Sequence, residues 1–324
     1  MCTAISFKTK NHYFGRNLDL EYSYDESVVI TPRNFPLKYR CEKEDRKHLS
    51  IIGTALIKDN YPLYYDATNE KGLSMAGLRF PEAVYFKEVS ESFFNISPFE
   101  FIPWVLSKCE TVKQAEELIR KTNLVCINFS DELTLSPLHW IISDKNCSIV
   151  IESTRTGIKI YDNTVGVLTN SPAFPYHMTN LNNYMNLSPY APKNTFSDNL
   201  ALESYSLGMG AIGLPGDLSS ASRFIRAAFV LSNSICDSDE VSSVNQFFHI
   251  LSSVSQQRGC TRLENGKNEI TLYSSCCNTD KGVYYYTTYD NSQISAVNMH
   301  RENLEGCSLI SYRLLKRGAV MFHN

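Results

Sequence analysis

Residues 1–20 read MCTAISFKTKNHYFGRNLDL, and this stretch predicts how the chain begins to fold. Residues 3–7 and 12–17 have the apolar and aromatic composition of two strands, whereas residues 8–11 between them are polar. The pattern predicts a β-hairpin. Because a hairpin reverses the chain, the far end of its second strand should lie beside the amino terminus.

Cys2 is an unusual residue at this position, because an exposed thiol is open to oxidation and to metal binding. If Met1 is removed, Cys2 carries a free α-amine beside its thiol. A cysteine thiol titrates at about 8.5 and an α-amine at about 7.7–8.0, so part of the amine is unprotonated at neutral pH and can accept the thiol proton. The terminus therefore predicts a nucleophile that carries its own base.

Arg16 and Asp19 lie on the second strand of the predicted hairpin, or just past it, and the hairpin folds them back beside Cys2. A guanidinium close to the sulfur would stabilise the thiolate, and a carboxylate close to the α-amine would orient it. The alternative is a solvated surface pair. Arg16 is set among Tyr13, Phe14 and Leu18, however, and burying a charge in such company costs several kcal/mol unless the charge is paired.

Strand patterns recur farther along the chain, where short turns join them. Residues 148–162 predict a hairpin with Gly157 in its turn, and residues 282–299 predict another with its turn at Asn291 and Ser292. Short connections of this kind favour antiparallel sheets.

Helices are predicted between these strands. Their ranges are 97–109, 111–122, 219–234 and 244–256. We expect Pro103 to bend the first helix or to end it early. Strands interspersed with helices, without strict β-α-β alternation, favour an α+β class with layered sheets. No linker or repeat divides the chain, so we expect one domain.

Composition and charge limit the partners. The 324 residues are 43% hydrophobic and 20% charged, with a net charge of −3, which is typical of a soluble globular protein and provides no basic surface for nucleic acid or an anionic membrane. We find no secretory signal and no apolar run long enough to span a bilayer. We therefore expect a cytoplasmic protein that has neither partner. The ten cysteines should be reduced there, and we expect most of them to be buried as small hydrophobic side chains.

Other motifs carry less weight. Gly208, Gly210 and Gly213 match a dinucleotide-binding fingerprint, but no suitable strand precedes them, and we interpret the stretch as a shaped loop. His139 lies in an apolar run and is interpreted as a core histidine rather than a catalytic base. No histidine pair or CxxC motif suggests a metal site.

The whole chain resembles the choloylglycine hydrolase family of N-terminal nucleophile hydrolases, which includes bacterial conjugated bile salt hydrolases and penicillin V acylases. The motifs that carry the resemblance are MCTAI (1–5), FGRNLDLEYSY (14–24), DNYPLYYDATNEKGLSMAGL (59–78), FEFIPWVL (99–106), LHWIISD (138–144), GVLTNSP (166–172), GLPGDLSSASRFIRAAF (213–229) and YYYTTYDNSQISAV (284–297). The resemblance implies a four-layer αββα sandwich of two antiparallel sheets flanked by helices.

The resemblance also implies roles for single residues. Cys2 is implied as nucleophile and base, with Arg16 near the thiol and Asp19 at the amine. Asn170 matches an oxyanion-hole asparagine, and Arg223 matches an arginine that supports the site from the start of a helix. Without the resemblance, Asn170 would be interpreted as a turn residue and Arg223 as an exposed helix charge. No metal and no cofactor are implied.

One position departs from the family pattern, because this chain has AGLRFP at 76–81 where bile salt hydrolases typically have AGLNFP. Arg79 therefore replaces an asparagine. Its backbone N–H should still serve as the second oxyanion donor. Its longer cationic side chain could either block the pocket or attract the carboxylate or sulfonate of a conjugated amino acid.

The positions that match the family's pocket loops are mainly apolar. They are Leu18, Tyr24, Tyr65, Phe129, Leu133 and Leu138. Together they could bury a steroid body, although each alone is also typical of a core residue.

The resemblance implies that the protein is a conjugated bile salt hydrolase spanning residues 2–324 after removal of Met1, and that it forms a homotetramer. The alternatives are a penicillin V acylase with the same machinery and a non-catalytic bile-acid-binding relative that keeps Met1.

Overall fold

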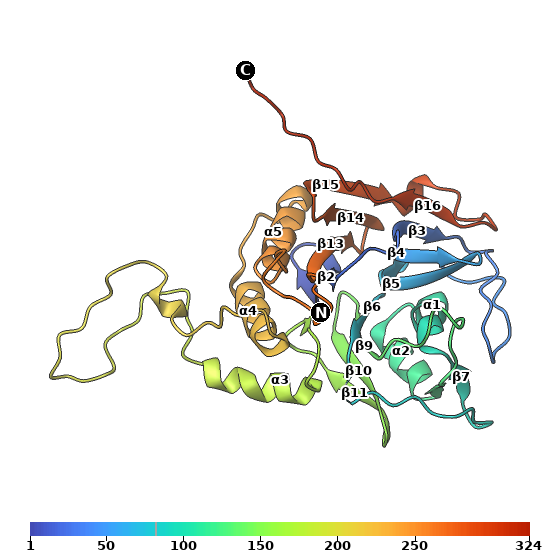
Figure 1. Cartoon of the computed structure of the whole chain (residues 1–324), viewed down its shortest axis with the longest axis horizontal. Helices are drawn as coiled ribbons and strands as arrows, with labels where there is room; N and C mark the ends of the chain where they lie inside the picture. The colour runs from blue at the N-terminus through green and yellow to red at the C-terminus, as the bar shows by residue number, and fades with distance from the viewer. Residues whose placement is uncertain (82) are drawn as a thin grey trace.

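The computed structural model describes residues 1–81 and 83–324 of the chain (Figure 1). The long strands are β1 (Cys2–Lys8), β2 (His12–Leu20), β3 (Ser27–Thr31), β4 (Ile51–Lys58), β5 (Tyr61–Asn69), β6 (Ser74–Arg79), β9 (Leu138–Ser143), β10 (Ser148–Thr154), β11 (Gly157–Asp162), β13 (Ile270–Asn278), β14 (Val283–Thr288) and β15 (Asn291–Asn298). The short strands are β7 (Phe94–Ile96), β8 (Thr122–Leu124), β12 (Val167–Leu168) and β16 (Ile310–Arg313). The α-helices are α1 (Phe101–Lys108), α2 (Val112–Ile119), α3 (Phe174–Asn180), α4 (Ser220–Asn233) and α5 (Glu240–Ser252).

These strands form two large antiparallel sheets. The six-stranded sheet has the order β12-β1-β2-β13-β14-β15, and the eight-stranded sheet has the order β11-β10-β9-β6-β5-β4-β3-β16. Strands β1 and β2 contact β6 of the other sheet, so the two sheets meet face to face around the amino terminus.

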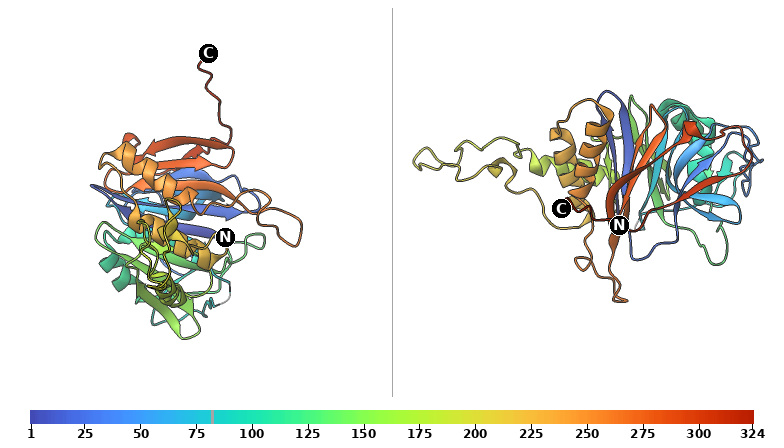
Figure 2. Two further views of the ribbon diagram at one scale, coloured as in Figure 1. Left: turned by 90° about the vertical axis from the view of Figure 1, so that its left-hand side faces the viewer. Right: turned by 90° about the horizontal axis from the view of Figure 1, so that it is seen from above.

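Helices cover both outer faces of this pair of sheets (Figure 2). Helices α4 and α5 pack on β1, β2, β12 and β13, whereas α1 packs on β4, β5 and β6 and contacts α2. One apolar core lies between the sheets and under α4 and α5, and a second lies between the eight-stranded sheet and α1 with α2. The predicted αββα sandwich is therefore confirmed.

The opening hairpin has the predicted form. Strands β1 and β2 pair antiparallel, with Cys2 opposite Leu18 and Lys8 opposite His12. Gly15 is required on β2, because a Cβ atom there would lie 2.0 Å from the backbone oxygen of Ser275 on β13. The amino-terminal strand β1 itself is interior to the sheet, because β12 and β2 pair with its two edges.

The predicted helices form, although the last spans Glu240–Ser252 rather than 244–256, and one expectation about the first was wrong. Thr111 and Ser219 cap α2 and α4 by accepting hydrogen bonds from Gln114 N and Ser222 N. Pro103 was expected to bend or end the first helix, and this was wrong. Helix α1 starts only at Phe101, after a 3₁₀ turn, so Pro103 lies in its first turn, where a backbone N–H has no intrahelical partner.

Two further corrections concern a turn and the cysteines. The turn between β14 and β15 lies at Tyr289–Asp290, two residues before the predicted position. The expectation that most cysteines are buried was wrong. Cys2, Cys109, Cys276 and Cys277 are buried, Cys236 is half-buried, and Cys41, Cys126, Cys147, Cys260 and Cys307 are exposed. The exposed thiols lie mainly in connections rather than strands, where no core is available to bury them.

The Gly208–Gly213 stretch is a loop with a 3₁₀ turn, as predicted, and helix α4 starts only at Ser220. This loop is the end of an arm, residues 185–212, that projects from the sandwich (Figure 1). Within residues 1–81 and 83–324, no helix combines the length and apolar character needed to cross a membrane.

Candidate active site

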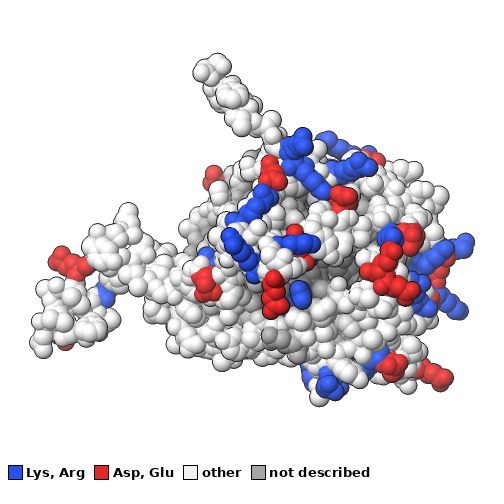
Figure 3. Space-filling view, in the orientation of Figure 1, with Lys and Arg blue, Asp and Glu red and all other residues white. Residues whose placement is uncertain are grey.

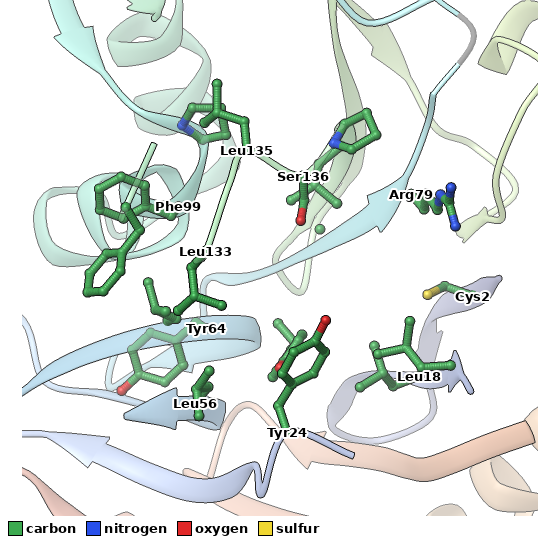
Figure 4. Close-up of a pocket in the computed structure, with 18 of the residues that line it drawn as sticks. Cys2, Leu18, Tyr24, Leu56, Tyr64, Arg79, Phe99, Leu133, Leu135 and Ser136 are labelled. Atoms are coloured by element: carbon green, nitrogen blue, oxygen red, sulfur yellow. The ribbon is translucent and has the colours of Figure 1, made fainter. Parts of the chain in front are cut away.

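Cys2 is the first residue of β1, and its side chain is 4% exposed. It lines a cavity of about 420 Å³ between the two sheets. Figure 4 shows the sulfur at one end of this cavity, between Leu18 and Arg79. The chain terminus is therefore inside the protein, at the wall of a cavity, rather than frayed in solvent.

Arg16 lines the same cavity and is fully buried. Its Nη1 donates to the carbonyls of Tyr65 at 3.0 Å and Gly77 at 2.5 Å, so backbone dipoles of the facing sheet hold the guanidinium. Among the described residues, no carboxylate forms an ion pair with it, and its buried Nη2 has no hydrogen-bond partner. Burial by itself lowers the pKa of Arg16, but Cys2, Tyr273 and Asp66 together raise it above its usual value, so the side chain remains a cation.

Asp19 is also fully buried, near the far end of β2. Its Oδ1 accepts a hydrogen bond from the hydroxyl of Thr271 at 2.6 Å, and its buried Oδ2 accepts none from the residues that the structure describes. Burial raises the pKa of Asp19, although Arg223 and the amino terminus oppose this. A bulge in β13 between Thr271 and Tyr273 brings the Thr271 hydroxyl opposite the carboxylate.

Met1 contacts Asp19 and Glu269 through its amino group. Its amino group donates to the Asp19 carbonyl at 3.0 Å and forms an ion pair with Glu269, which is 7% exposed. Burial lowers the pKa of the Met1 amino group. With Met1 in place, the nitrogen of Cys2 is an amide rather than an amine, and it donates to Asn170 Oδ1 at 2.8 Å.

Asn170 and Arg223 come from distant parts of the chain and meet at Cys2. Asn170 follows β12 and is 7% exposed, and Arg223 lies in the first turn of α4 and is fully buried. Arg223 Nη1 donates to the Cys2 carbonyl at 2.5 Å and to Thr3 Oγ1 at 2.6 Å, while Nη2 donates to Asn170 Oδ1 at 2.7 Å. Arg223 is thus not the exposed helix charge that its sequence context alone suggested.

The Asn170 side chain is oriented by these contacts. Its Oδ1 accepts from Cys2 and Arg223, so its Nδ2 faces the other way and donates to the Arg79 carbonyl at 2.8 Å. An amide nitrogen carries two N–H groups, so one donor remains after the bond to Arg79. The Asn170 side chain thus links the Cys2 nitrogen to the Arg79 backbone.

The predicted pocket residues all line the same cavity. They are Leu18, Tyr24, Tyr65, Phe129, Leu133 and Leu138, with Arg79. Further lining residues that the sequence analysis did not single out include Leu20, Tyr22, Leu56, Leu63, Phe99, Ile102, Leu135 and Trp140. Figure 4 shows Phe99, Tyr64 and Leu133 at the end of the cavity away from Cys2, and Arg79 beside the sulfur on the opposite side.

Three polar residues near Cys2 were also missed. Glu269 and Thr271 contact the amino terminus and Asp19, and the Ser220 hydroxyl accepts from the backbone N–H of Asn170 at 2.9 Å. Glu269 and Thr271 at the start of β13 and Ser220 at the start of α4 form no recognisable motif, so only their spatial neighbours identify them. Among the described residues, no cluster of three or more His, Cys, Asp or Glu side chains could hold a metal ion.

Comparison with known proteins gives the same family along the whole chain. Residues 2–312 match the family of linear amide C–N hydrolases called the choloylglycine hydrolase family. The chain is 55% identical to a bile salt hydrolase/transferase from Lactiplantibacillus plantarum over 97% of both chains. It is 41% identical to a bile salt hydrolase/transferase from Clostridium perfringens over 98% of both.

Solved structures agree with this assignment. A variant of the conjugated bile acid hydrolase from Clostridium perfringens superposes with a TM-score of 0.92 at 39% identity, over the full length of both chains. Penicillin V acylase from Agrobacterium tumefaciens has the same fold, with a TM-score of 0.73 at 17% identity over 96% of this chain and 90% of that one. The resemblance seen in the sequence is therefore confirmed, and the chain belongs to the choloylglycine hydrolase family of linear amide C–N hydrolases.

Proposed function

We propose that this protein is a conjugated bile salt hydrolase, which cleaves the amide bond of glycine- or taurine-conjugated bile acids. The observation that carries the proposal is the buried Cys2 thiol at one end of a large, mainly apolar cavity, with the side-chain amide of Asn170 beside it. Relatives named as bile salt hydrolases over nearly the full length support the substrate class. Residues 2–324 would act as one catalytic domain after Met1 is removed.

Removal of Met1 creates the base in this proposal. The nitrogen of Cys2 lies 2.8 Å from Asn170 Oδ1, so the freed α-amine can donate a hydrogen bond to this oxygen. Asp19 supplies a buried Oδ2 without a partner, which can accept a second hydrogen bond from the amine. A cation beside the thiol, Arg16, stabilises the thiolate that forms when the amine takes the proton.

The chemical steps follow from these positions. The Cys2 sulfur attacks the amide carbonyl, and negative charge develops on the carbonyl oxygen. The second N–H of Asn170 Nδ2 and the backbone N–H of Arg79 donate to this oxygen. The α-amine then protonates the departing glycine or taurine, and water hydrolyses the thioester that remains on Cys2. The steps need no metal and no cofactor.

The cavity supports a steroid as the acyl group. Its lining is rich in leucine, tyrosine and phenylalanine, and burial of apolar surface contributes about 25 cal/mol per Å². A steroid body that fills the end near Phe99 and Tyr64 would direct its side-chain amide toward Cys2, with the amino acid directed toward Arg79 (Figure 4).

The test is a pair of assays. kcat/KM should be higher for taurodeoxycholate than for penicillin V by at least about tenfold, and the opposite order would make the protein a penicillin V acylase. Cys2→Ala should abolish turnover and leave the fold intact. Intact mass should show that Met1 is absent, whereas an inactive protein that retains Met1 and binds bile acid would be a non-catalytic relative.

We also propose a homotetramer located in the cytoplasm. Support for assembly comes from the arm, residues 185–212, which carries few charged side chains (Figure 3) and exposes Met185, Tyr190, Phe196, Tyr205 and Leu207 by 79% or more. Such apolar surface is normally covered by another chain, and light scattering would measure the assembly. The ten free cysteines, five of them exposed, support a reducing compartment.

A further inference from the structure

Two buried histidines outside the cavity flank the peptide of Asn170. His139 Nε2 contacts the carbonyl oxygen of Thr169 at 2.9 Å, and His177 Nε2 contacts the carbonyl oxygen of Asn170 at 2.9 Å. A carbonyl can only accept, so each Nε2 carries a proton and donates. Both side chains are fully buried, and neither lines the cavity. Two consecutive carbonyls next to the Asn170 side chain are therefore held by imidazoles.

Each imidazole also packs on a second part of the active site. The ring of Phe80 stacks on His139 with centroids 4.5 Å apart and planes 3° apart, and the ring of Phe224 stacks on His177 at 4.8 Å and 21°. Phe80 directly follows Arg79, and Phe224 directly follows Arg223. The two histidines thus join the Asn170 segment to the strand that carries Arg79 and to the helix that carries Arg223.

Glu152 on β10 completes the arrangement around His139. Its Oε1 lies 3.4 Å from His139 Nδ1 and accepts from the backbone N–H of Phe174 at 2.8 Å. This contact on the Nδ1 side and the Thr169 contact on the Nε2 side together fix the plane of the imidazole ring.

We propose that His139 and His177 are positioning residues of the oxyanion hole. They hold the Thr169–Asn170 backbone so that the Asn170 amide and the Arg79 N–H converge on one point. The inference rests on the proposed function, because it assumes that charge develops on a carbonyl oxygen at Cys2. An oxyanion donor is effective only at about 2.7–3.1 Å from that oxygen, so a small displacement of the Asn170 backbone lowers the rate.

Two pairs of variants test whether His139 and His177 position the Asn170 backbone or only stabilise the fold. His139→Phe keeps a ring to stack on Phe80 and removes the N–H donor, and His177→Phe does the same opposite Phe224. Each should lower kcat for a taurine conjugate by about 10- to 100-fold, with KM changed by less than about twofold. His139→Gln and His177→Gln restore an N–H donor and should recover at least about a third of the native kcat.

A second measurement isolates the oxyanion hole from the nucleophile. Alkylation of Cys2 by iodoacetamide needs the thiolate but builds no negative charge on an attacked carbonyl oxygen. Its rate should be unchanged in His139→Phe and His177→Phe. The matched control is His12→Phe. His12 is also buried on a strand, but it contacts Ser6 and Thr279 instead of the Asn170 segment. Its replacement should therefore leave kcat unchanged.

The possible results distinguish failure of this inference from failure of the proposed function. Native kcat in both phenylalanine variants would overturn the inference and leave the proposed function standing. A parallel fall of kcat and of the alkylation rate would also overturn it, because the nucleophile would then be affected as well. Absence of amide hydrolysis by the unsubstituted protein, with Met1 removed, would refute the proposed function and this inference with it.

Discussion

The backbone N–H of Cys2 donates to Asn170 Oδ1 at 2.8 Å, although the two residues are 168 positions apart in the chain. Arg223 donates to the same oxygen and to the Cys2 carbonyl, so one guanidinium holds both residues. The asparagine oxygen therefore accepts from two donors, and the amide nitrogen points the other way and donates to the Arg79 carbonyl at 2.8 Å. The same contacts that fix the terminus also orient the Asn170 amide, which is the proposed oxyanion donor.

The amino group of Cys2 should be essential for turnover. A variant with a short peptide fused before Met1 keeps the thiol but leaves Cys2 with an amide nitrogen, which cannot accept a proton. We expect hydrolysis to fall by at least about 100-fold, the range attributed to a positioned general base. Proteolytic release that leaves Cys2 as the first residue should restore the rate, as measured by product release and intact mass. Full activity of the fused protein would contradict the mechanism.

Arg223→Lys should lower kcat more than it affects substrate binding. A lysine ammonium cannot reproduce the guanidinium fork that reaches Cys2, Thr3 and Asn170 together. We expect kcat to fall by about 100-fold and KM to change little. The control is Arg226→Lys, one turn farther along α4, where the side chain contacts only the exposed Asp217 carbonyl. Equal losses in both variants would show that the effect belongs to the helix and not to the fork.

Arg79→Asn should weaken binding of conjugates without disabling the reaction. The backbone N–H is unchanged by the substitution, so kcat should stay within about threefold. Loss of the cation beside the sulfur should raise KM for glycine and taurine conjugates by about fivefold at low salt. Added salt should reduce the difference from the native protein, because it screens an exposed charge. Arg79→Lys retains the charge and is the control, and a lower KM in Arg79→Asn would mean that Arg79 obstructs the pocket.

Leu133→Ala should raise KM for bile salts through lost apolar contact. Leu133 lines the end of the cavity away from Cys2 (Figure 4). Removing up to three methylene-sized groups at about 0.8 kcal/mol each predicts a KM increase of about tenfold when the contact is partial. The rate of Cys2 alkylation should not change, since the nucleophile is untouched. An unchanged KM would place the steroid elsewhere.

Acid should destabilise the fold through His12. Burial lowers the pKa of His12 from 6.5 to about 4. Between these values the unfolded chain binds more protons than the native one, so stability falls as the pH falls, by about 3 kcal/mol from this residue alone. His12→Gln should remove that part of the slope. Urea unfolding at pH 7.5, 5.5 and 4.5 measures it, and identical slopes in the two proteins would contradict the assignment.

Local pattern was enough to predict the opening hairpin, the capped helices α2 and α4, and the loop at Gly208–Gly213. In each case the determinant is a near neighbour in sequence, such as the cap at Thr111 or the polar turn between two apolar runs. The position of Pro103 could not be judged in this way, because its effect depends on where the helix begins. The exposed cysteines were likewise missed, since burial of a small side chain depends on what packs over it.

Some residues of the candidate site could likewise be predicted from local sequence, and others could not. Cys2, Arg16 and Asp19 share one hairpin, so their proximity follows from strand pairing alone. Asn170 and Arg223 came only through the family resemblance, because a turn asparagine and a helix arginine carry no local signal. His139 was correctly interpreted as a core residue, yet its contacts with Thr169 and Phe80 are invisible in the sequence.

The amino-acid sequence by itself determined the candidate nucleophile Cys2, the strand that presents it and the family to which the chain belongs, because these depend on residue types close together along the backbone. Tertiary structure alone decided that Arg223 is buried against Cys2, that the Asn170 amide nitrogen contacts the Arg79 backbone, and that two imidazoles contact the carbonyls of Thr169 and Asn170. Those features arise where two sheets and a helix meet. Desolvation there favours a partner for each buried polar group, and most of these partners come from segments that only the complete fold brings together.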